Sequence, residues 1–253
     1  MKLFNITFLF FCMFCSIISA GTRDPLIPDS KYSDFGKQFP FVGRLYGKNE
    51  DGSIFFASSI AIKNKIILTA AHVVEKSKDC VVHINGKQIP IKSIVCHQEF
   101  KEDNFGYYDI AVCLIEDDID LKFYPELYMD SDEIKKPCTI SGFGLNGTFE
   151  SGAIHYDSER RAGSNKIDTV EKGLLICTPS LRRGDSDFTS LEFLISSGDS
   201  GGGLFIGNRL AGINSCIIAY DKKLDSSYGD ESGHTRISDN VEWINRTIES
   251  LGE

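Results

Sequence analysis

The sequence lacks an excess of positive charge. Its 253 residues include 27 Lys and Arg against 36 Asp and Glu, which gives a formal net charge of −9 at pH 7. Proteins that bind nucleic acids concentrate Lys and Arg on one face to meet the phosphates. This balance argues against a nucleic-acid partner. A composition of 42% hydrophobic and 25% charged residues predicts a packed globular fold.

After its first twenty residues the sequence has no apolar run of membrane-spanning length. The N-terminal segment has Lys2, then LFNITFLFFCMFCSII, then the small residues Ser19 and Ala20. A spanning helix needs about 20 apolar residues, and this run is shorter and has the form of a secretory signal. We expect residues 1–20 to be cleaved. Gly21 would then be the mature N-terminus of a secreted, soluble protein that has left the membrane.

The mature chain also lacks the closely paired C-x-x-C spacing of a zinc site, so we predict no metal and no other cofactor. Export permits disulfide bonds, but spacing alone does not fix which cysteines would pair. The six cysteines after residue 20 are Cys80, Cys96, Cys113, Cys138, Cys177 and Cys216.

The mature chain does contain many short apolar or alternating runs, separated by turn residues. Examples are FVGRLYG, SIFFASSIAI, KIILTA, YDIAVCLI, GGLFIG and LAGINSCIIA. INGKQI places Asn85-Gly86, a strong hairpin signal, between two such runs. Only the end, SDNVEWINRTIESLG, has helical spacing, behind a cap at Asp239 or Ser238. The pattern predicts an all-β sandwich or barrel, with a long surface loop over the polar residues 146–170.

Three polar residues stand at the ends of apolar runs. His72 follows one run in LTAAHVV, Asp109 enters another in YYDIAVCLI, and Ser200 lies in the glycine-rich ISSGDSGGGLF. Each residue alone has a plain structural interpretation, because such residues are common in turns. Together they supply a nucleophile, a base and a group that orients the base.

In this order the three segments resemble the active-site motifs of the chymotrypsin and trypsin family of serine proteases. CTISGFG, LAGINS and HTRISDNVEWI resemble further family segments, so the similarity covers nearly all of the mature chain. The resemblance implies two packed antiparallel six-stranded β-barrels and a C-terminal α-helix, with the site between the barrels. We expect one protease domain over 21–253, with barrels over roughly 36–130 and 131–237 and the helix over 238–251.

The resemblance implies a secreted, monomeric serine endopeptidase that acts on peptide or protein substrates through an acyl-enzyme. His72 would take the proton of Ser200, Asp109 would orient the imidazole, and the N–H groups of Gly198 and Ser200 would form the oxyanion hole. Protein protease inhibitors are a further class of expected partner. The alternative is a catalytically silent homologue that acts as a binding protein.

The resemblance also assigns the substrate pocket. Leu194 stands where trypsin-like relatives carry an acid at the pocket floor, so we expect no preference for Lys or Arg. Ser215 resembles the serine that supports the family aspartate. Cys216 and Ile217 follow it at the pocket wall, where the branched Ile217 favours a small or aliphatic substrate side chain. His234 is interpreted either as a packed histidine or as a donor to an acidic substrate residue.

Asp199 resembles the family acid that forms a buried pair with a new N-terminus after activation cleavage. However, no Arg or Lys followed by an Ile-Val-Gly-Gly start precedes FPFVGRLYG. A buried carboxylate is costly unless a cation or hydrogen bonds compensate it. Our hypothesis is that signal cleavage itself supplies the ammonium of Gly21, without a zymogen step. Another basic group is the alternative.

Overall fold

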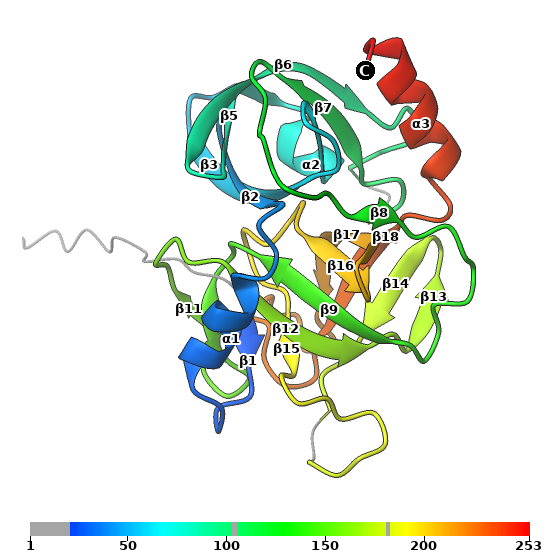
Figure 1. Cartoon of the computed structure of the whole chain (residues 1–253). Coiled ribbons are helices and arrows are strands. Elements are labelled where there is room, and N and C mark those ends of the chain that lie inside the picture. The colour runs from blue at the N-terminus through cyan, green and yellow to red at the C-terminus, as the bar shows by residue number, and fades with distance from the viewer. Residues whose placement is uncertain (1–20, 103–105, 181–182) are drawn as a thin grey trace, which may run out of the picture.

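The computed structural model describes residues 21–102, 106–180 and 183–253, and most of its elements are β-strands. The expected signal segment 1–20 lies outside the described residues. Two bodies of strands are stacked on one another, and the C-terminal helix lies beside the upper one (Figure 1).

The upper body is a closed antiparallel barrel with the strand order β2-β3-β4-β7-β6-β5. A two-residue turn at Asn85 and Gly86, with φ values of 49° and 73°, joins β5 to β6, as the hairpin signal predicts. The short helix α2 (Ala71–Val74) follows β4. The strands are β2 (Val42–Asn49), β3 (Ile54–Ala61), β4 (Ile66–Thr69), β5 (Ser77–Ile84), β6 (Lys87–Cys96) and β7 (Ala111–Ile115).

The lower body is built on a sheet with the order β12-β9-β16-β17-β18-β14-β13, and β8 (Glu126–Leu127) pairs with β17 outside this path. Only Ile167 and Asp168 separate β12 from β13, so the chain itself joins the two ends of the sheet. When β12 and β13 are counted as one bent strand, the ring has six members. The strands are β9 (Pro137–Gly142), β12 (Arg161–Lys166), β13 (Thr169–Glu171), β14 (Leu174–Cys177), β16 (Gly203–Ile206), β17 (Arg209–Ile218) and β18 (Glu231–Arg236). The predicted all-β fold of two packed antiparallel barrels is therefore confirmed.

The polar stretch 146–170 is not one long loop, and this part of the prediction is wrong. It contains three complete strands and the start of β13. Two of the three join a second, four-stranded sheet, in which β1 lies between β10 and β15. Backbone hydrogen bonds pair these polar segments with neighbouring strands, so they form sheets without alternating apolar and polar residues. The strands of the small sheet are β1 (Thr22–Arg23), β10 (Asn146–Thr148), β11 (Gly152–His155) and β15 (Phe193–Leu194).

Helix α1 (Asp29–Gly36) is attached to β12 by a buried ionic group. Arg161 is 1% exposed and donates hydrogen bonds to both Asp29 and Asp157. Burial would raise the pKa of Asp29, but the hydrogen bonds and charge of Arg161 outweigh it and lower that pKa. The two carboxylates therefore neutralise a guanidinium that would otherwise be too costly to bury.

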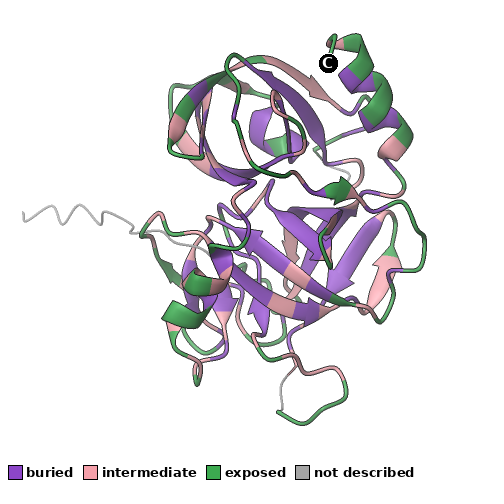
Figure 2. Cartoon of the chain, viewed as in Figure 1, coloured by how far each residue is buried: buried purple, intermediate pink, exposed green. Residues whose placement is uncertain are grey.

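The C-terminal helix α3 (Val241–Ser250) packs its predicted apolar stripe against the upper barrel. Trp243, Ile244 and Ile248 are buried there, which confirms the expected helix. The N-cap of the helix is Asn240, one residue after Asp239 and two after Ser238, the caps inferred from the sequence. Buried residues fill both bodies (Figure 2). Among the described residues, no helix combines the length and apolarity needed to cross a membrane.

None of the six described cysteines forms a disulfide bond. Cys138 and Cys177 nevertheless lie close together in the core of the lower barrel, with their Sγ atoms 3.8 Å apart. The two strands that carry them, β9 and β14, are neighbours of the bent β12–β13 segment on opposite sides.

Candidate active site

The pairing of β4 with β7 brings His72 and Asp109 together. Thr69 at the end of β4 is opposite Ala111 at the start of β7, and the two polar residues lie just beyond these positions. Nδ1 of His72 is 2.7 Å from Oδ2 of Asp109, and the backbone N–H of His72 donates to Oδ1 at 2.9 Å. This geometry favours the tautomer with its proton on Nδ1, which leaves Nε2 free to act as a base.

The carboxylate of Asp109 is almost completely buried, and hydrogen bonds compensate its burial. Its side chain is 3% exposed, whereas that of His72 is 38% exposed. Ser215 in β17 donates from Oγ to Oδ2 of Asp109 at 2.6 Å, across the boundary between the barrels. Thr235 in β18 donates to the Asp109 carbonyl at 3.1 Å. The lower barrel therefore helps to fix the orientation of a carboxylate that the upper barrel carries.

The loop that carries Ser200 requires glycine at position 198. Gly198 has a φ of 91°, and a Cβ there would lie 2.3 Å from the ring of Phe56 and 3.0 Å from Cα of Gly144. Neither the Gly198 amide nor the Ser200 amide donates a backbone hydrogen bond within the described chain. Both N–H groups therefore remain available to a developing oxyanion.

Gly201 seats the same loop against the upper barrel. A Cβ at Gly201 would lie 2.1 Å from Oγ1 of Thr69 and 3.1 Å from the backbone nitrogen of Ala70, two residues before His72. Over residues 21–102, 106–180 and 183–253, no hydrogen bond joins the Ser200 hydroxyl to His72. Such contacts commonly tighten only when substrate binds.

Ser58 in β3 holds the Ser200 loop in place, and sequence analysis does not single it out. Its backbone N–H donates to the carbonyl of Ser200 at 2.8 Å, and its Oγ donates to the carbonyl of Gly198 at 3.0 Å. It also accepts hydrogen bonds from the Phe143 N–H and from Thr69 Oγ1. The available signal is a pair of adjacent serines within the apolar run SIFFASSIAI.

Asp199 is fully buried, and its carboxylate accepts a hydrogen bond from the backbone nitrogen of Gly21. That nitrogen lies 3.0 Å from Oδ2, and the carboxylate also accepts N–H bonds from Gly144 at 2.8 Å and Ser196 at 2.9 Å. Burial raises the pKa of Asp199 to about 6, although these hydrogen bonds act in the opposite direction. Gly21 has a φ of 57°, and a Cβ there would lie 1.9 Å from the ring of Phe193.

The comparison with protein families agrees with this arrangement. The trypsin family model matches residues 31–244. The chain belongs to the trypsin family. Membership supports a peptidase function in general, with peptides or proteins as substrates.

Solved structures of trypsin-like proteases share the fold. Neuropsin, a serine protease expressed in the limbic system of mouse brain, has a TM-score of 0.65 and 16% identity, and the match covers 83% of this chain and 95% of that one. HL collagenase has a TM-score of 0.67 and 19% identity, with coverages of 90% and 97%. The structure of GrC has a TM-score of 0.66 and 17% identity, with coverages of 90% and 98%. No curated protein matches the chain.

In this trypsin-family chain, β17 and β18 carry four of the five residues assigned to the substrate pocket. Ser215 lies between the paired positions Asn214 and Cys216 of β17, and Ile217 pairs with Ser232 of β18. Leu194 lies in a different sheet. It is buried in β15 and pairs with Thr22 of β1, so its backbone belongs to the small sheet.

His234 is completely buried and hydrogen-bonded through both ring nitrogens. Nδ1 lies 2.9 Å from Oδ1 of Asn214, and Nε2 lies 3.0 Å from Oγ of Ser232. Burial lowers the pKa of His234 to about 3, so the ring is neutral at physiological pH. This environment corresponds to the packed histidine, one of the two interpretations drawn from the sequence.

Proposed function

We propose that the protein is a secreted serine endopeptidase in which His72, Asp109 and Ser200 form the catalytic triad. The observation that carries the proposal is the double hydrogen bond between His72 and the buried Asp109. A carboxylate so placed orients the imidazole and stabilises the positive charge that it gains. Trypsin-family membership supports peptide-bond hydrolysis as the reaction.

In the proposed reaction, the Ser200 hydroxyl attacks the substrate carbonyl while Nε2 of His72 accepts its proton. The N–H groups of Gly198 and Ser200 stabilise the oxyanion, and loss of one such donor typically costs about 3 kcal/mol of transition-state stabilisation. His72 then gives the proton to the leaving amine, which leaves an acyl group on Ser200. Water, activated by the same imidazole, hydrolyses this ester.

We further propose that cleavage after Ala20 activates the enzyme directly. The freed nitrogen of Gly21 would become an ammonium and form an ion pair with Asp199 in the position that its amide occupies. The 3.0 Å contact and the tight fit of Gly21 against Phe193 support this assignment. Mass measurement of the secreted chain tests it, since any other mature N-terminus would contradict it.

We propose a monomeric protease domain over 21–253, with barrels over roughly 36–130 and 131–237.

Small or aliphatic side chains are the proposed preference at the residue before the scissile bond, because Ile217 and the neutral His234 offer no charge. Profiling with a peptide library tests this preference. Efficient cleavage after Lys or Arg would overturn it.

Labelling with a fluorophosphonate probe tests the catalytic proposal. The probe esterifies an activated serine, so we expect labelling of the secreted protein and none of its Ser200→Ala variant. A Ser197→Ala variant, changed at an exposed serine of the same loop, serves as the matched control. A folded wild-type protein that resists the probe would support the silent homologue instead.

A further inference from the structure

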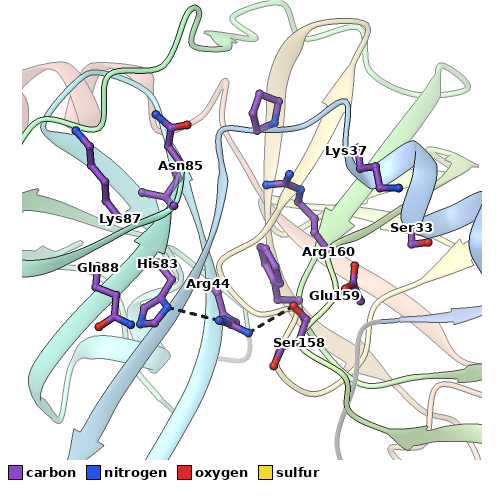
Figure 3. Close-up of a pocket in the computed structure, with 14 residues that line it drawn as sticks. Ser33, Lys37, Arg44, His83, Asn85, Lys87, Gln88, Ser158, Glu159 and Arg160 are labelled. Carbon is purple, nitrogen blue, oxygen red and sulfur yellow. Dashed lines mark hydrogen bonds between the residues drawn. The ribbon is translucent and has the colours of Figure 1, made fainter.

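A basic cleft of about 530 Å³ lies outside the candidate active site. Side chains approach it from the β5–β6 hairpin, from β2, from helix α1 and from the segment before β12 (Figure 3). The lining residues used in the argument are Lys37, Arg44, His83, Lys87, Phe143 and Arg160. Positive charge therefore gathers here in a chain whose net charge is −9.

Two arginines of the cleft have no acidic partner among the described residues. Arg160 donates only to the backbone carbonyls of Gly36 and Val42, both at 2.8 Å. Burial lowers the pKa of Arg160 to about 10, and it gains little compensation from nearby carboxylates. The next residue, Arg161, is bound by two carboxylates. Of these adjacent arginines, Arg161 is neutralised by carboxylates and Arg160 is not.

The hydrogen bonds of Arg44 are longer than those of Arg160. Its Nη atoms make contacts of 3.5 Å with the carbonyl of Ser158 and with Nδ1 of His83, both drawn in Figure 3. Its Nε is buried and has no hydrogen-bond partner in the described part of the chain. A buried guanidinium N–H without an acceptor is costly, so this group can gain from an incoming anion.

An aromatic ring lies near both guanidinium groups. The centre of Phe143 is 5.9 Å from the Cζ of Arg44 and 5.7 Å from that of Arg160. Among the described residues, Glu159 is the only carboxylate that lines the cleft, and it is exposed. Lys37 and Lys87 already have acidic partners, so they contribute less. The arrangement offers charged donors beside an apolar surface, which suits a carboxylate carried on a hydrocarbon side chain.

We propose that this cleft is a subsite for a carboxylate-bearing segment of a protein substrate, remote from the scissile bond. The inference rests on the proposed peptidase function. The Phe143 N–H donates to Ser58 Oγ, which in turn donates to the Gly198 carbonyl, so the cleft lies close to the oxyanion loop. A peptide that leaves the active site can therefore reach it.

An acidic peptide fits these observations better than a sulfated polysaccharide. A polysaccharide with repeated charges needs an extended, exposed track of cations, whereas the unpaired cations here are two recessed arginines. The remaining surface of a strongly acidic chain would repel a long polyanion. One or two carboxylates on a flexible peptide meet the same donors without that repulsion.

Matched peptides provide the test. One cleavable sequence is extended, at either end in separate peptides, by an Asp- and Glu-containing tail or by the corresponding Asn and Gln tail. We expect the acidic tail at one end to raise kcat/KM about tenfold through a lower KM, an effect that added salt reduces. Equal rates for acidic and neutral tails on the wild-type protein would overturn the proposal.

Two variants test whether the preference for acidic tails depends on the cleft. Arg44→Gln should abolish most of the preference and leave cleavage of the neutral peptides unchanged. Arg209→Gln, which removes an equal charge at the exposed pair with Asp130, should retain the preference. Equal losses in the two variants, or competition by a sulfated oligosaccharide without any effect of the acidic tail, would contradict a peptide subsite.

Binding to the Ser200→Ala protein separates the two proposals. If the acidic peptide binds this variant about tenfold more tightly than its neutral counterpart while the wild-type protein cleaves neither, the peptidase assignment fails and the subsite stands. If both peptides are cleaved but bind equally, the subsite fails and the peptidase assignment stands.

Discussion

The backbone nitrogen of Gly21 lies 3.0 Å from Oδ2 of Asp199, although 178 positions separate the two residues. Asp199 directly precedes the candidate nucleophile, so a mature N-terminus at Gly21, as proposed above, would act on the loop that presents Ser200.

Gly21→Ala should impair both stability and activity. The new Cβ would meet the ring of Phe193 at 1.9 Å. This overpacking should cost about 3 kcal/mol. Gly207→Ala is the control, because Gly207 has open space around it, and its φ of 59° should make the substitution cost only about 1 kcal/mol. Urea unfolding of the two mature variants measures the difference, and similar losses would contradict a steric role for Phe193.

A chain that retains Ala20 should lose stability as the pH rises above 4. Without the Gly21 ammonium, burial raises the pKa of Asp199 from 3.8 to about 6, so the folded state holds a proton that the unfolded state releases. Stability should therefore fall by about 2 kcal/mol between pH 4 and pH 7. Urea unfolding across this range checks it against Asp199→Asn in the same extended chain, which lacks the titrating group. Parallel curves for the two proteins would refute the prediction.

Asp109→Asn should lower kcat by roughly 10⁴-fold, because the amide would favour the wrong imidazole tautomer. Ser215→Ala should have a smaller effect, about tenfold, since it removes one hydrogen bond to the buried carboxylate. Steady-state kinetics on a peptide substrate measures both. Ser53→Ala, at an exposed serine that binds Asp51, should leave the rate unchanged. An equally small loss for Asp109→Asn would exclude His72 and Asp109 as a functional pair.

Cys138 and Cys177 should form a disulfide when the protein is secreted under oxidising conditions. Their Sγ atoms are 3.8 Å apart, and transfer of two electrons and two protons to a small-molecule disulfide would join them. Burial raises the pKa of Cys177, so the bond should form before the lower barrel closes. The link should stabilise the fold by about 3 kcal/mol relative to Cys138→Ser.

Alkylation followed by intact-mass measurement checks the cysteine pair. We expect the secreted wild-type protein, once unfolded, to react at four of its six mature cysteines, and Cys113 to be among those that react. Alkylation at all six would refute the pairing, and protection in the Cys138→Ser variant would point to another partner.

The apolar runs were sufficient to predict an all-β sandwich or barrel, because a strand with one buried face repeats its apolar residues in a way that the sequence displays. The arrangement as two barrels was predicted from the resemblance to the protease family. The hairpin was predictable from the Asn85-Gly86 turn signal, and α3 from the helical spacing of its apolar residues. Strand β12 was not. Its sequence RAGSNK has no apolar alternation, and its burial depends on Asp29 and on pairing with β9, both distant in the chain.

Some residues of the candidate site could likewise be predicted from the sequence, whereas the surroundings of others could not. The motifs around His72, Asp109 and Ser200 are local and could be found in the sequence. The environment of His234 depends on the register between β17 and β18, which sets Asn214 opposite it. Arg160 and Arg161 are neighbours with different surroundings, and the sequence alone cannot distinguish them.

Ser58 uses its backbone N–H, its carbonyl and its hydroxyl in contacts that extend from its own barrel to the loop of the other. In an upper barrel made alone, the N–H and hydroxyl of Ser58 would lose their partners in the other half, and the loop would lose its support. The two halves should consequently melt in a single transition, and fragments cut between them should regain their shape only when mixed. A partly folded chain would thus lack the contacts that hold the Ser200 loop in place.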